Sequence, residues 1–305
     1  MHPEVASSEI IPLLHTRDVA REAASLGKLG PAEARRLLER SGFRYPRLNI
    51  VFHCLKGGAA KTTLAYNTAY RLAQLGTRVL LVDLDKQANA TASFGLGRPD
   101  RVFVDVVTGD ATAEQAVVRV AESLDVIPSS LDNARLEPEL IHRRVNPRTY
   151  YRNLLAPVRD RYDVTIFDLP PDLSHNTYLT SLYADVICIP TTPDEYSVHG
   201  MRLTLGAVES IAREYPDARP RVLVIWTRFD PREKSALSYI AENSKLDGAE
   251  VLPIVIRTDV TFKNAQARAQ SVFQLRKRSA AREDIDLLAR ELVGLRELSE
   301  KAGNA

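Results

Sequence analysis

The stretch that decides the fold of this 305-residue chain is Lys56-Gly57-Gly58-Ala59-Ala60-Lys61-Thr62-Thr63. It follows an apolar run, residues 48–54, that is typical of a buried strand, and it opens into an amphipathic stretch, residues 62–75, that is typical of a helix. A glycine-containing turn between a strand and a helix binds phosphate, because backbone N–H groups and the helix dipole both face the anion. Lys61 is placed to contact the β- and γ-phosphates and Thr62 to ligate Mg²⁺, so the stretch predicts a nucleotide site.

Short apolar runs and longer amphipathic stretches alternate from residue 47 onward. The apolar runs are residues 48–54, 78–82, 124–127, 164–167, 186–189, 222–226 and 251–256. The amphipathic stretches include residues 62–75, 147–158, 197–214 and 234–243. This alternation predicts an α/β fold, a doubly wound and mostly parallel sheet with helices on both faces. Ligands of such sheets bind at the carboxyl ends of the strands.

The first 46 residues have a different pattern. Residues 16–26 and 32–40 read as two short helices, separated by Gly30-Pro31. We therefore expect a helical N-terminal extension, residues 1–46, before the nucleotide-binding domain, residues 47–305. The extension fits a partial helix-turn-helix, a dimer arm or simple packing.

Composition sets broad limits. Hydrophobic residues make up 45% of the chain, charged residues 26%, and the net charge is only +2, so a nucleic-acid surface would have to be a local patch. Cys54 and Cys188 lie in apolar runs without metal-ligand spacing, which indicates buried thiols in a reducing compartment. Neither a secretory signal nor an apolar stretch of about 20 residues is present. We expect a soluble, cytoplasmic protein.

Two further strand ends carry carboxylates. Asp83 and Asp85 alternate at the end of the second run, so both point toward the same side, as suits metal hydration and the positioning of water. Asp168 follows four apolar residues and precedes Leu169-Pro170-Pro171, which is the pattern of a carboxylate that holds Mg²⁺ through water. Prolines beyond it stiffen the segment where a γ-phosphate-sensing switch is expected.

These three loops resemble those of the ParA/MinD family of ATPases with a deviant Walker A motif, K-G-G-x-G-K-[ST]. The second loop resembles the family's D-x-D-P-Q-G-N-A-T except at Lys86 and Ala88, and the third resembles its D-x-P-P. The resemblance extends over residues 48–298 and includes 127–132 and 190–196. Ala60 stands where the family has glycine, and Arg257 stands where it usually has a proline beside the adenine.

The resemblance implies a slow ATPase that works as a dimer, with ATP and Mg²⁺ as cofactors. Lys56 would reach the phosphates bound by the other subunit of an ATP-dependent sandwich homodimer. Asp83 would act on a Mg²⁺-bound water beside Thr62 and Asp168, while Asp85 would orient the attacking water, so Lys56, Lys61 and Asp85 would be the catalytic residues. Thr227 and Arg228 lie where family members contact the nucleotide base.

The resemblance is closest to ParA-type, Soj-like proteins that segregate chromosomes or plasmids, whose ATP dimer binds double-stranded DNA non-specifically and is released by a ParB-like partner. Such a protein would be nucleoid-associated. The candidate DNA-binding residues form a basic cluster in the last third of the chain: Arg232, Lys234, Lys263, Arg268, Arg276, Lys277 and Arg278.

Two alternatives within the family fit the sequence less well. A MinD-like membrane ATPase needs a basic, amphipathic C-terminal helix, but residues 284–300 mix acids with arginines and their Ile285, Leu288, Leu292 and Leu295 stripe is typical of core packing. A relative of the nitrogenase iron protein would place its cysteines in exposed loops. A dinucleotide dehydrogenase would require G-x-G-x-x-G, which is absent after the first run.

Overall fold

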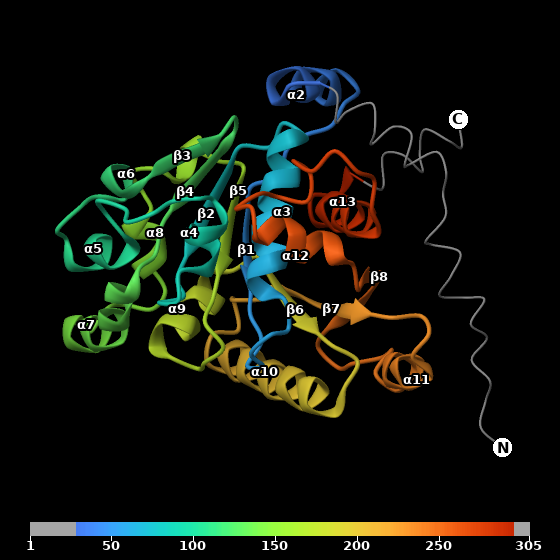
Figure 1. The fold of residues 1–305 in the computed structure, drawn as a ribbon. Helices are drawn as coiled ribbons and strands as arrows, with labels where there is room; N and C mark the ends of the chain where they lie inside the picture. Colours follow the sequence, from blue (N-terminus) through green and yellow to red (C-terminus); the bar gives the residue numbers. More distant parts are fainter. Residues whose placement is uncertain (1–28, 296–305) are drawn as a thin grey trace.

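One eight-stranded sheet forms the centre of the molecule (Figure 1). The computed structural model describes residues 29–295. The strands, in spatial order, are β3 (Val118–Ala121), β4 (Leu124–Ile127), β2 (Val79–Asp83), β5 (Val164–Asp168), β1 (Leu48–Phe52), β6 (Val186–Thr191), β7 (Arg221–Phe229) and β8 (Glu250–Arg257). All neighbouring strands are parallel except β3 and β4, which are antiparallel. The α/β, mostly parallel class predicted from the sequence is confirmed.

The strand order brings the three motif-bearing loops together. Strands β2, β5 and β1 are immediate neighbours, although β2 and β5 are about 80 residues apart in the sequence. Their register pairs Asp168 with Phe52 on one side and with Asp83 on the other. Because the strands are parallel, their carboxyl ends meet at one edge of the sheet, so the phosphate loop and both acidic loops share that edge.

Helices cover both faces of the sheet. The first face carries α2 (Pro31–Arg40), α3 (Lys61–Gln74), α4 (Asn89–Ser93), α12 (Val260–Gln266) and α13 (Ala280–Leu292). The second carries α5 (Phe103–Thr108), α6 (Ala113–Ala116), α7 (Leu136–Arg143), α8 (Tyr150–Leu154), α9 (His175–Tyr183), α10 (Glu195–Glu214) and α11 (Lys234–Glu242). Two short 3₁₀ turns, Leu131–Arg135 and Arg159–Arg161, complete the connections on the second face.

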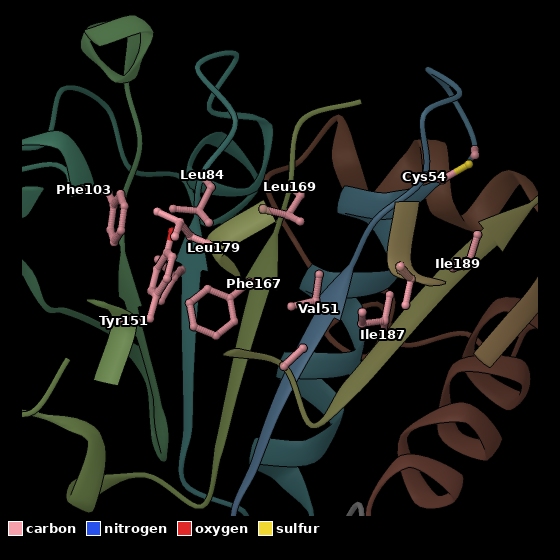
Figure 2. Packing of buried hydrophobic residues seen from close by; sticks show 14 of the residues in the cluster. Val51, Cys54, Leu84, Phe103, Tyr151, Phe167, Leu169, Leu179, Ile187 and Ile189 are labelled. Atoms are coloured by element: carbon pink, nitrogen blue, oxygen red, sulfur yellow. The ribbon is translucent and has the colours of Figure 1, made fainter. Parts of the chain in front are cut away.

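Alternation along the strands divides the core into two layers. Ile50 and Phe52 of β1 pack with α3 and α13, whereas Val51 faces the opposite layer. Figure 2 shows that opposite layer, with Phe167 beside Tyr151 and with Val51 between Phe167 and Ile187. Both faces of the central strands are buried, as the continuous apolar runs predicted.

Helix α2 packs on the same core as the strands. Ala34 and Phe43 are buried with residues of α3 and the sheet, and the backbone of Arg35 lies so close to Gly76 that a side chain at Gly76 would meet it at 2.6 Å. The predicted helix over residues 32–40 is confirmed. The predicted helix over residues 16–26 lies outside the described residues.

Several elements differ from the sequence-based expectation. The helix expected over 147–158 is only α8, because Pro157 would lie in its last turn and cannot donate a backbone hydrogen bond. The strand expected over 48–54 ends at Phe52, where the phosphate loop begins. Strand β3 and helices α4 to α7 and α9 were not predicted, while the expected burial of Cys54 and Cys188 as free thiols is confirmed.

Candidate functional site

The phosphate loop makes a tight turn at two left-handed residues. Gly58 has φ of 77° and Ala60 has φ of 72° and ψ of 19°. Ala60 is also the N-cap of α3, and its carbonyl accepts the first helical hydrogen bond, from Leu64 N at 2.9 Å. The left-handed conformation costs a residue with a Cβ about 1 kcal/mol, so Ala60 carries strain that the family's glycine avoids.

The two lysines of the loop point to different places. Lys61 is 7% exposed, and its Nζ donates to the carbonyl oxygens of Cys54 at 3.1 Å and Lys56 at 3.3 Å, inside the loop. Burial lowers the pKa of Lys61, although nearby carboxylates oppose the shift. Its ammonium thus lies where a phosphate group would replace the carbonyl contacts.

Lys56 lies against the start of α10 instead. Its Nζ is 3.5 Å from Asp194 Oδ1 and 5.2 Å from the ring centroid of Tyr196, whose side chain is largely exposed. A Cβ at Gly200 would approach Lys56 Cβ to 3.3 Å, so glycine at this position lets α10 pass close to the loop. The ammonium of Lys56 therefore lies beside Asp194 and Tyr196 at the start of α10, not inside the phosphate loop.

Asp168 is a buried carboxylate whose nearest donor is the hydroxyl of Thr62. It is fully buried, and neither oxygen has a partner of good geometry among the described residues. Burial raises the pKa of Asp168, and the charge of Asp83 raises it further, while the neighbouring Thr62 hydroxyl and Lys61 offset part of the rise. Orphaned buried carboxyl oxygens are rare, and here they lie beside Lys61 and the first turn of α3.

Asp83 and Asp85 differ in how their oxygens are used. Asp83 is fully buried and accepts hydrogen bonds from Thr91 N at 2.9 Å, Thr91 Oγ1 at 2.7 Å and Asp85 N at 3.2 Å. Burial nevertheless raises the pKa of Asp83 to about 6. The Asp85 carboxylate accepts from Gln87 N at 2.9 Å through Oδ1, and Oδ2 has no partner among the described residues. Ser129 Oγ donates to the backbone carbonyl of Asp85 at 2.6 Å.

This donor set suits Mg²⁺ bound together with phosphates. Residues 29–295 contain no cluster of three or more His, Cys, Asp or Glu side chains that would hold a metal ion alone. Mg²⁺ typically takes one or two carboxylates and completes its shell with phosphates and water. The unpaired oxygens of Asp168 beside Thr62 supply that protein side, and the loop amides and Lys61 supply the phosphate side.

The residues expected to contact the base occupy two kinds of environment. Thr227 is fully buried, and its hydroxyl donates to Ala59 O at 3.3 Å, so it supports the phosphate loop from beneath. Arg228 is exposed with φ of 53°, at an irregularity in the pairing of β7 with β8 that redirects its side chain. Arg257 ends β8 and forms a two-pronged ion pair with Asp284, which fixes the start of α13.

His53 is a buried residue of this site that the sequence reasoning missed. It lies between β1 and the phosphate loop, and its Nε2 is 3.0 Å from the carbonyl oxygen of Asp172, so Nε2 carries the proton and donates. Burial lowers the pKa of His53 to about 4, so the ring is neutral at pH 7. Asp172 Oδ1 in turn accepts from Ser174 N and Thr177 Oγ1, which anchors the end of the segment that starts at Asp168.

The seven basic residues singled out as DNA-binding candidates are all exposed. Arg232 is ion-paired with Asp230 at 2.6 Å, but the other six have no carboxylate partner among the described residues. Five of those six lie between positions 263 and 278, a segment held on α3 because Asn67 Oδ1 accepts from Ser271 Oγ and Val272 N at 2.9 Å. The segment thus presents unpaired positive charge from a fixed position.

The C-terminal helix α13 packs its apolar stripe into the core. Ile285, Leu288 and Leu292 are buried against α3 and β8, as the sequence predicted, and Leu295 beyond the helix is buried too. Within residues 29–295, every helix is too short or too polar to cross a membrane.

Comparisons with known proteins agree with this geometry. A family model described as an AAA domain matches residues 48–219. The probable plasmid-partitioning protein ParA of Thermus thermophilus is 34% identical over 300 residues, which cover 91% of this chain and 88% of that protein. The sporulation initiation inhibitor protein Soj of Bacillus subtilis is 30% identical, with 78% of this chain and 94% of Soj covered.

A solved structure has the same fold at lower sequence identity. Apo McdA from Cyanothece superposes with a TM-score of 0.71 at 23% identity, covering 80% of this chain and 98% of McdA. The range matched by the family model begins at β1 and contains the phosphate loop and both acidic loops, so the match includes the part of the fold that carries the site. On these grounds the chain belongs to the ParA/MinD family of ATPases, with ParA-type partitioning proteins among its relatives.

Proposed function

We propose that this protein is a ParA-type ATPase that segregates a chromosome or plasmid by binding DNA as an ATP-dependent dimer. The observation that best supports ATPase activity is the buried carboxylate of Asp168, which lacks a partner of good geometry among the described residues and lies beside Lys61 and Thr62. A buried carboxylate without partners destabilises the nucleotide-free protein. A cation bound together with the nucleotide phosphates neutralises this carboxylate and removes the destabilisation. The ParA and Soj relatives support the role in partitioning.

In this proposal each residue of the site has one task. Lys61 and the amides of the loop hold the β- and γ-phosphates, while Thr62 and Asp168, with Asp83 behind them, hold Mg²⁺ and its water. The Mg²⁺ ion supplies charge neutralisation at the phosphates. Asp85 has a free carboxyl oxygen at the same sheet edge and orients the attacking water. Phosphoryl transfer of this kind needs positioning and electrostatic stabilisation more than covalent catalysis.

Lys56 completes the site of a second subunit. Its ammonium contacts the half-exposed Asp194 at 3.5 Å and the ring of Tyr196, and a phosphate group can compete with Asp194 for it. Hydrolysis is then slow in the monomer, because one stabilising charge arrives only on dimerisation. A ParB-like partner accelerates the step and releases the dimer from DNA.

The unpaired basic residues between positions 263 and 278 supply the DNA contacts. Cations without carboxylate partners need not break an ion pair before they bind phosphate. A dimer has twice as many of these cations as a monomer, so its DNA binding depends more steeply on salt concentration. Binding of this kind is independent of sequence, and it places the ATP-bound dimer on the nucleoid.

Substitution of Lys56 by alanine tests the dimer. We expect Lys56→Ala to bind ATP with unchanged affinity but to sediment as a monomer with ATP, and to lose ATP-dependent DNA binding in a mobility shift. Lys245→Ala, which changes an exposed lysine away from the loop, is the matched control. An intact ATP dimer of the Lys56→Ala protein would remove the basis for the assignment, and ATP-dependent recruitment to liposomes without DNA binding would favour a MinD-like role instead.

A further inference from the structure

A cleft lined with arginines lies at the edge of the sheet opposite the phosphate loop. It has a volume of about 550 Å³ and is bordered by the first residues of β1 and β5, the residue before β6 and the end of α9. Its rim carries five arginines: Arg47, Arg148, Arg152, Arg159 and Arg219. A volume of this size is within the range of small-molecule sites in proteins.

The cleft has more cations than its acids can neutralise. Arg47 pairs with Asp160 at 2.6 Å, and Arg148 pairs with Asp217, which occupies two of the three exposed aspartates of the lining. Arg159 reaches the already paired Asp160 only at 3.9 Å. Arg219 donates its Nε to a carbonyl oxygen, that of Pro216, at 2.9 Å, and Arg152 has no polar partner among the described residues. Within residues 29–295, the guanidinium groups of Arg152, Arg159 and Arg219 therefore have no carboxylate oxygen closer than 3.9 Å.

The other two acids of the lining, Asp163 and Asp185, are bound by other groups, although Asp185 is exposed and accepts hydrogen bonds only through Oδ2. Asp163 accepts from Arg35 at 2.6 Å and from Arg78 at 2.7 Å, two arginines that lie outside the lining. Asp185 accepts from the backbone N of Asn49 at 2.7 Å and from its Nδ2 at 3.0 Å. The lining itself holds five arginines and four aspartates, and Asp163 is already neutralised by Arg35 and Arg78 from outside it. The cleft therefore carries an excess of positive charge.

We propose that this cleft is a second ligand site, which binds a small molecule with two or more adjacent phosphoryl groups. The guanidinium group is planar and donates paired hydrogen bonds that match phosphate oxygens, which favours phosphoryl groups over a halide or a single carboxylate. Several arginines around a small concave volume favour a compact polyanion. A DNA duplex instead distributes its charge along a rod, with one charge per about 1.7 Å of helix axis. The site is independent of the nucleotide site, because the length of β5 separates the two.

Inorganic pyrophosphate is the probe that tests the proposal, by calorimetric titration of the full chain. Because the phosphate loop also binds phosphates, the titration is done with the Lys61→Ala protein, alone and combined with Arg152→Gln and Arg219→Gln. We expect measurable binding to the Lys61→Ala protein and a loss of about tenfold or more in affinity for each added arginine substitution, since each removes a charge-assisted hydrogen bond. Arg213→Gln, which changes an exposed arginine of α10, is the control that leaves binding unchanged.

Two readouts separate the outcomes. Arg152→Gln and Arg219→Gln in the otherwise natural chain should leave ATP hydrolysis and the urea midpoint unchanged, because neither residue forms an ion pair within residues 29–295. Absence of pyrophosphate binding to the Lys61→Ala protein at concentrations of about 10 mM, or binding that both arginine substitutions leave intact, overturns the proposal. Weakened DNA binding with no pyrophosphate binding also overturns it and assigns these arginines to DNA.

Discussion

Asp163 and Asp168 stand at the two ends of the same strand, β5, and their carboxylates have opposite surroundings. Asp163, just before the strand, accepts hydrogen bonds from Arg35, from Arg78 and from the backbone N of Arg78 at 2.8 Å. Burial alone would raise the pKa of Asp163, but these bonds outweigh it and lower the pKa. Asp168, about 17 Å away at the last residue of the strand, has no such bond and a raised pKa.

The difference separates the tasks of the two sheet edges. At the amino edge the carboxylate is neutralised inside the protein and ties α2 to the start of β2 and β5. At the carboxyl edge the carboxylate is left unpaired in a buried site, which lowers stability and leaves its oxygens for a ligand. Unsatisfied groups in an otherwise well-packed domain mark functional positions. The same residue type thus serves structure at one end of a strand and function at the other.

The largest effect is expected from Asp168→Asn. Removing the carboxylate should lower Mg²⁺-dependent ATP hydrolysis by about a hundredfold or more, because a charge that holds the metal is lost. The same substitution should raise the free energy of unfolding at pH 7 without nucleotide, because it removes a charge forced into a buried site. Hydrolysis assays and urea unfolding measure the two effects, and Asp100→Asn, at an exposed position, is the control. A variant that is both inactive and less stable contradicts this view of Asp168.

Asp163→Asn should lower stability and leave hydrolysis unchanged, the opposite of Asp168→Asn. We expect a loss of about 3 kcal/mol in the free energy of unfolding, because Arg35 and Arg78 lose a shared, largely buried partner. Hydrolysis per folded molecule should not change. Asp160→Asn, which breaks an exposed ion pair with Arg47, should cost less than about 1 kcal/mol and serves as the control. Equal losses of unfolding free energy for the two variants in urea would show that the buried ion pairs of Asp163 stabilise the protein no more than an exposed pair does.

The raised pKa values at the carboxyl edge of the sheet should make the stability of the protein depend on pH. Because the pKa of Asp83 is raised to about 6, the folded protein keeps a proton that the unfolded chain releases near pH 4. Between these values the folded state binds more protons, so the free energy of unfolding falls as pH rises, by about 2 kcal/mol. Asp168 acts in the same direction, whereas Asp163 stabilises the protein above pH 4 and loses its contribution below it.

Urea unfolding at pH values from 4 to 7, without nucleotide, measures this slope. Asp83→Asn and Asp168→Asn should each flatten it, while Asp100→Asn should not. A slope that neither of the first two variants changes would mean that other groups set the pH dependence in this window.

The sequence predicted the residues that gather at the carboxyl edge better than the contacts at the amino edge. Lys61, Asp83 and Asp168 each follow an apolar run, and a parallel sheet brings the ends of its strands together without further information. The pairing of Asp163 with Arg35, 128 positions away, has no local pattern, and neither does the approach of His53 to Asp172 or the convergence of five arginines on one cleft. Such contacts depend on tertiary packing. The edge strand β3 escaped prediction because it is short and only half-buried.

Backbone strain at the carboxyl edge gives the smallest effect. Ala60 and Ala88 are both left-handed N-caps, of α3 and α4, with φ of 72° and 52°, and both stand where the family has glycine. Ala60→Gly and Ala88→Gly should each raise the free energy of unfolding, by up to about 1 kcal/mol, because glycine adopts this conformation without a Cβ clash. Thermal or urea unfolding of the nucleotide-free protein measures the gain.

Ala92→Gly is the control within the same short helix, α4. Ala92 is exposed and has ordinary helical geometry, so the same chemical change there should lower stability by about 0.5–1 kcal/mol. Opposite signs at positions 88 and 92 would locate strain in the loops of the carboxyl edge, in addition to the unpaired charge of Asp168. A loss at Ala60 and Ala88 as large as that at Ala92 would mean that the loops adopt another conformation in solution, and that the electrostatic difference between the two ends of β5 alone distinguishes the functional edge.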